Sequence, residues 1–126
     1  MKFARFVFIG AGIWGLAVLL PFYALVDITG RRYAAPVEYP HFFYGFFSVT
    51  LAWQLAFLLI SSDPERYRAL MPVGVVEKFS WVITLTVLHW QGRVAAIDMQ
   101  SLWPDLILGA LFIAAFVATR PAERRE

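Results

Sequence analysis

The chain alternates between long runs without any charged residue and short polar segments. Two runs exceed twenty residues, at 6–26 and 39–62, and two shorter runs cover 79–92 and 106–119. Because an α-helix rises about 1.5 Å per residue, crossing roughly 30 Å of hydrocarbon takes about 20 residues. The first two runs are therefore long enough to span a membrane by themselves.

The two shorter runs reach that length only if their helices begin earlier, so that the third includes Glu77 and Lys78 and the fourth includes Asp105. Pro72 and Pro104 suit a first helical turn, and acidic residues near a helix N-terminus are favoured by the helix dipole. We expect Lys78 to extend toward the lipid headgroups. The pattern predicts one all-α domain over residues 1–126, a polytopic bundle of four transmembrane helices at 6–25, 42–60, 72–91 and 102–119.

The distribution of Lys and Arg predicts the direction of these spans. With four spans both termini lie on one side, and that side then holds eight basic residues: Lys2, Arg5, Arg66, Arg68, Lys78, Arg120, Arg124 and Arg125. The other side holds Arg31, Arg32 and Arg93. The positive-inside rule therefore predicts cytoplasmic termini. No small-x-small cleavage motif follows the first run, so we expect that helix to remain uncleaved.

Composition supports a membrane protein and excludes several other classes. Of the 126 residues, 60% are hydrophobic and 16% charged, whereas a soluble domain carries about 25% charged residues. The net charge of +2 is too small for a nucleic-acid-binding face. The absence of cysteine excludes thiol chemistry and thiolate metal sites.

Residues 6–15 match the glycine pattern of a dinucleotide-binding fold, with Gly10, Gly12 and Gly15 in the required positions. That chemistry needs a hydrated turn, a parallel sheet and an acidic residue about 20 positions later. The apolar run instead continues to Leu25, so we reject nucleotide binding. In a membrane, small residues let helices approach closely. We therefore predict helix packing through small residues in the first and fourth helices: Ala11, Gly15, Ala110, Ala114 and Ala118.

The predicted topology gathers several polar residues in the outer leaflet. His41 begins the second helix there, His89 ends the third, and Asp105 lies near the start of the fourth. Two histidines and a carboxylate from three helices are able to bind a metal, orient a lipid headgroup or hold a small polar substrate. Their spacing is not diagnostic of a metal site, because no two of them lie close together on one helix, and interfacial His residues are also common structural anchors.

Two further polar residues lie within predicted helices. Gln54 lies near the centre of the second helix, where an interhelical hydrogen bond would satisfy its amide. Glu77 lies in the third helix, and Arg5 is the expected partner for its charge. The alternative for Gln54 and Glu77 is a transport or proton-linked role, which requires a solvent path between these two residues.

The segment from Tyr44 to Ser80 resembles a group of small, uncharacterised bacterial four-span integral-membrane proteins. The similarity is carried by Tyr-Gly-Phe at 44–46, Ala-Trp-Gln at 52–54, Asp-Pro-Glu-Arg-Tyr-Arg at 63–68 and Glu-Lys-Phe at 77–79. This resemblance implies a bacterial inner-membrane location and supplies no catalytic residues.

Our leading hypothesis is a non-enzymatic structural or accessory component of the bacterial cytoplasmic membrane. We expect no cofactor and no metal, and as partners the lipid bilayer and either a second copy or another membrane protein. The alternatives are a small-molecule or lipid-binding protein, enzymes included, with an outer-leaflet site, and a transport or proton-linked protein. The binding candidates are His41, His89, Asp105, Gln54 and Glu77.

Overall fold

The computed structural model describes residues 2–22 and 40–121, and these form four long helices. They are α1 (Lys2–Phe22), α3 (Pro40–Ser62), α4 (Met71–Trp90) and α5 (Leu102–Ala118). Two short 3-10 segments, η1 (Arg68–Leu70) and η2 (Ala96–Ser101), lead into α4 and α5. The all-α prediction is confirmed. Four helical segments are long and apolar enough to cross a membrane: Lys2–Pro21, Tyr44–Ser62, Arg68–Trp90 and Ala96–Ala118.

Local sequence explains where the helices begin and end. Pro72 lies in the first turn of α4, where its missing N–H costs no hydrogen bond. At the other end of α4, Gly92 takes a positive φ of 72° and donates its N–H to the His89 carbonyl oxygen. The Arg93 N–H bonds to the Leu88 carbonyl oxygen, which completes a glycine-terminated helix cap.

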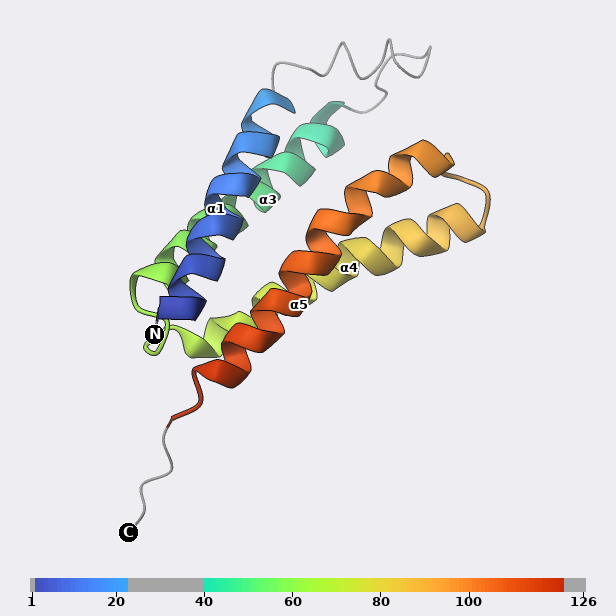
Figure 1. Cartoon of the computed structure of the whole chain (residues 1–126). Coiled ribbons are helices and arrows are strands. Elements are labelled where there is room, and N and C mark those ends of the chain that lie inside the picture. The colour runs from blue at the N-terminus through green and yellow to red at the C-terminus, as the bar shows by residue number, and fades with distance from the viewer. Residues whose placement is uncertain (1, 23–39, 122–126) are drawn as a thin grey trace.

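The helices pack as two antiparallel hairpins, α1 with α3 and α4 with α5 (Figure 1). Contacts between α1 and α5 join the two hairpins, whereas α3 and α4 make few contacts with each other. The start of α1 and the end of α5 lie at the same end of the bundle (Figure 1). The four helices therefore alternate in direction, as four successive membrane crossings require.

A continuous core joins the hairpins in the half of the bundle nearer the α3–α4 connection. Phe8, Phe57 and Phe112 are fully buried, and the ring centroid of Phe112 lies 4.4 Å from that of Phe8 and 4.8 Å from that of Phe57. The rest of the buried cluster consists of Ala4, Ala11, Ile60, Met71 and Ala115. Toward the opposite end the two hairpins diverge (Figure 1).

Large apolar side chains point outward from every helix. Phe6, Val49, Val76 and Ile107 are each more than half exposed, and Trp90 and Trp103 are exposed where α4 ends and α5 begins. Exposed apolar surface of this extent is unfavourable in water and suits contact with lipid. With four apolar helices long enough to cross a bilayer, the chain is a multi-pass membrane protein.

Candidate functional site

Three charged side chains meet between α4 and α5. Lys78 Nζ lies 3.2 Å from Asp105 Oδ1 and 3.4 Å from Glu77 Oε2. Lys78 is only 4% exposed, although lysine is among the residues least often buried. We name Glu77, Lys78 and Asp105 the ionic cluster. Its position corrects the expectation that Lys78 extends to the headgroups, because the ammonium group has a carboxylate partner inside the bundle.

α4 and α5 approach each other closely enough for Lys78 to reach Asp105. A Cβ on Gly109 would lie 2.8 Å from Cε2 of Phe79, so the α5 backbone approaches the Phe79 ring more closely than alanine would permit. From α3, the Phe57 ring lies 5.2 Å from Lys78 Nζ, within range of a cation–π interaction. The buried ammonium group is therefore stabilised by two carboxylates and one aromatic face.

The ionic cluster lies in the middle of two membrane-spanning segments. Lys78 is ten residues from Arg68 and twelve from Trp90, the two ends of its segment. Asp105 is nine residues from Ala96 and thirteen from Ala118. At about 1.5 Å per residue in the α-helices and about 2 Å in the 3-10 segments, each charge is roughly 16–20 Å from either end. The sequence places Glu77 toward the cytoplasm and Asp105 toward the outer leaflet, whereas the structure brings both to Lys78.

Gln54 lies in a different part of the bundle, against α1. It is 1% exposed, and a Cβ added to Gly15 would overlap its carboxamide, so the two residues are in direct contact. Gln54 Nε2 donates to the Thr50 carbonyl oxygen at 2.9 Å, a bond within α3 rather than between helices. Gln54 Oε1 is buried and accepts no hydrogen bond. The residue of α3 that reaches the ionic cluster is Phe57, one turn further along.

The predicted outer-leaflet residues have separate neighbours. His89 Nδ1 lies 3.1 Å from the Val94 carbonyl oxygen, and the His41 ring is tilted against the Phe42 ring with centroids 4.3 Å apart. Asp105 pairs with Lys78 instead. Within residues 2–22 and 40–121, no three His, Cys, Asp or Glu side chains are grouped so that they could hold a metal ion.

The small residues divide into an inward and an outward set. Ala11 is fully buried, and Gly12 and Gly15 bring α1 against α3. On α5 the inward small residues are Gly109 and Ala115, whereas the predicted packing residues Ala110, Ala114 and Ala118 are exposed. Gly109 was not among the packing residues predicted from the sequence. It could have been recognised by its position four residues after Asp105, on the same helix face, and one residue before the alanine repeat.

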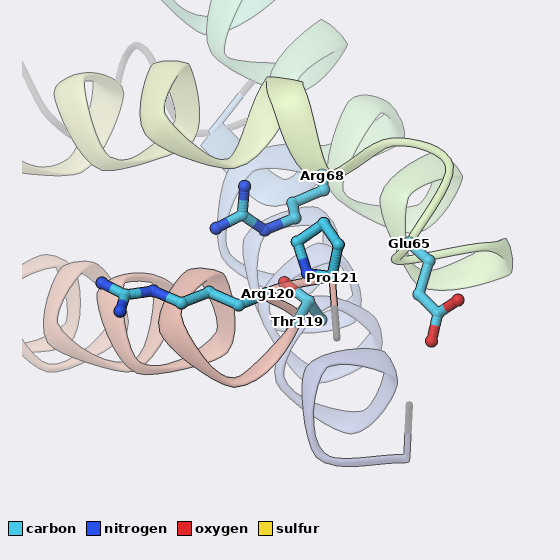
Figure 2. A pocket seen from close by; sticks show the side chains of 5 residues that line it. All are labelled: Glu65, Arg68, Thr119, Arg120 and Pro121. Atoms are coloured by element: carbon cyan, nitrogen blue, oxygen red, sulfur yellow. The ribbon is translucent and has the colours of Figure 1, made fainter. Parts of the chain in front are cut away.

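A polar hollow of about 310 Å³ lies where α5 ends beside the α3–α4 connection, lined by Glu65, Arg68, Thr119, Arg120 and Pro121 (Figure 2). Arg68 Nη2 donates to the Phe116 carbonyl oxygen at 3.0 Å, and its guanidinium carbon lies 3.7 Å from the Phe116 ring centroid. A cation here satisfies a terminal carbonyl of α5 and complements its dipole. Arg68 therefore links the α3–α4 connection to the end of α5 through a hydrogen bond and a cation–π contact.

No protein-family model matches this chain, and no curated protein or solved structure is detectably similar to it.

Proposed function

We propose that this chain is a non-enzymatic accessory component of the bacterial cytoplasmic membrane that acts by associating with other transmembrane helices. Both termini are cytoplasmic in this proposal. The partner is a second copy of the chain or another membrane protein.

The orientation rests on basic residues outside the helix centres. Because Lys78 is enclosed by carboxylates in mid-span, we leave it out of the comparison. The side with the termini still has the larger set, Lys2, Arg5, Arg66, Arg68, Arg120, Arg124 and Arg125, against Arg31, Arg32 and Arg93. This imbalance favours cytoplasmic termini.

The proposed accessory role rests on the outward face of α5. Ala110, Ala114 and Ala118 recur every four residues and are all exposed, while Gly109 and Ala115 are used inside the bundle. Small residues at this spacing let another helix come close, and in lipid such packing drives association. The face of α5 that bears Ala114 is therefore the proposed contact surface.

Cysteine cross-linking tests this role cleanly, because the natural chain contains no cysteine. Ala114→Cys is expected to form cross-linked dimers, or adducts with another protein, in native membranes treated with a short bifunctional maleimide. Val76→Cys is the matched control, because Val76 is 65% exposed on α4 at a similar distance from the same end of the bundle. Monomer alone from Ala114→Cys, or equal products from both variants, would contradict the proposal.

A further inference from the structure

The charges of the ionic cluster do not balance. Among residues 2–22 and 40–121, the charged groups that face Glu77 are Lys78 and Asp105, and α3, which contributes Phe57, contains no Asp, Glu, Lys or Arg. Two carboxylates and one ammonium group leave one negative charge when all three are ionised. A net charge in the centre of a bilayer is costly, and such groups are neutralised or paired.

The two carboxylates are not equivalent in their contacts. Asp105 Oδ1 accepts a hydrogen bond from Lys78 Nζ at 3.2 Å. Glu77 Oε2 is 3.4 Å from the same nitrogen, and this buried oxygen accepts no hydrogen bond. Its side chain is also the more enclosed of the two, at 16% exposure against 23% for Asp105. Glu77 is therefore the member whose negative charge is less well compensated.

We propose that the ionic cluster is an intramembrane binding site for one proton, which Glu77 carries. The Glu77 carboxylate gains a proton and forms one O–H bond, and the cluster changes from a net charge of −1 to zero while Lys78 and Asp105 remain an ion pair. A metal cation is less suited to the site, because hard cations require six or more oxygen ligands and the ammonium group already lies between the carboxylates. This inference goes beyond the accessory role, which requires no proton.

Infrared spectroscopy of the purified full-length protein in lipid vesicles tests the proposal through the C=O stretching band of protonated carboxyl groups. At neutral pH the wild type is expected to show this band, and ¹³C-labelled glutamate is expected to shift it. Glu77→Gln removes the band. Asp105→Asn also removes it, because a single carboxylate beside Lys78 is balanced when ionised. Lys78→Met makes the band about twice as intense, since both carboxyls then lack a cation.

Glu65→Gln is the matched control, because Glu65 is exposed at the end of the bundle and its loss should leave the band unchanged. Absence of the band from the wild type would mean that a cation or a basic side chain of another helix neutralises the cluster, and would overturn the proposal. Retention of the band in Asp105→Asn, or a shift only with labelled aspartate, would also overturn it. Glu77→Gln in the Ala114→Cys background separates the two proposals. This variant lacks the carboxyl group that binds the proton, and cross-linking through residue 114 is expected to persist in it.

Discussion

Gly15 of α1 and Gln54 of α3 are closely fitted to each other. A Cβ at Gly15 would overlap the carboxamide and come within 2.6 Å of Gln54 Cγ. Because Gln54 is 1% exposed, its side chain has little room to move away. Gly15 therefore allows α1 to approach α3 closely at Gln54, as Gly12 does at Leu58.

Gly15→Ala is expected to lower the free energy of unfolding by about 1–3 kcal/mol, the usual cost of overpacking a filled interior. Titration of the protein in mixed detergent micelles with SDS measures this change. Gly10→Ala on the same helix is the control, because a Cβ there meets nothing within 4 Å and stability should not fall. In a Gln54→Ala background the cost of Gly15→Ala should shrink, and an undiminished cost would show that the two side chains are uncoupled.

Between helices, Phe112 connects α5 to both helices of the other hairpin, because its ring stacks on Phe8 of α1 and meets Phe57 of α3. It is fully buried and projects from α5 into the opposite hairpin. Phe112 therefore contributes directly to the attachment of α4 and α5 to the other two helices.

Phe112→Ala is expected to cost about 3–5 kcal/mol of unfolding free energy, because it leaves a cavity where the two hairpins meet. The adjacent Ile113 is 46% exposed, so Ile113→Ala should remain within about 0.5 kcal/mol of wild type. The same SDS titration compares the two variants. Equal losses would mean that the Phe112 contacts do not join the hairpins.

The helices were predictable from sequence, but the contact between Lys78 and Asp105 was not. The two long charge-free runs locate α1 and α3 directly. In α4 and α5 the charge-free runs are shorter than the helices, because Glu77, Lys78 and Asp105 interrupt the apolar sequence. Those interruptions suggest membrane boundaries, whereas η1 and η2 extend both segments and leave the charges in mid-span. The axial register of α4 against α5 depends on the fit of Phe79 onto Gly109, which a one-dimensional pattern does not encode.

For the whole molecule, the proposed orientation places the α3–α4 connection in the cytoplasm and the α4–α5 connection outside. Single cysteines at Glu65 and Arg93 report on these two connections, because both residues are exposed. In intact cells a membrane-impermeant maleimide is expected to label Arg93→Cys and to label Glu65→Cys only after permeabilisation. The reverse pattern would invert the orientation, and labelling of both or neither before permeabilisation would contradict an odd number of crossings between them.

The phenylalanine core lies at one end of the bundle, so the two hairpins are less tightly joined at the other end. Phe8, Phe57 and Phe112 hold the hairpins together near the α3–α4 connection. Beyond them Phe46 of α3 still meets Trp81 of α4, with ring centroids 5.7 Å apart, before the hairpins diverge toward the far end (Figure 1). Separation of the hairpins is therefore expected to cost least at the far end, so the amplitude of their relative motion should increase with distance from the phenylalanine core.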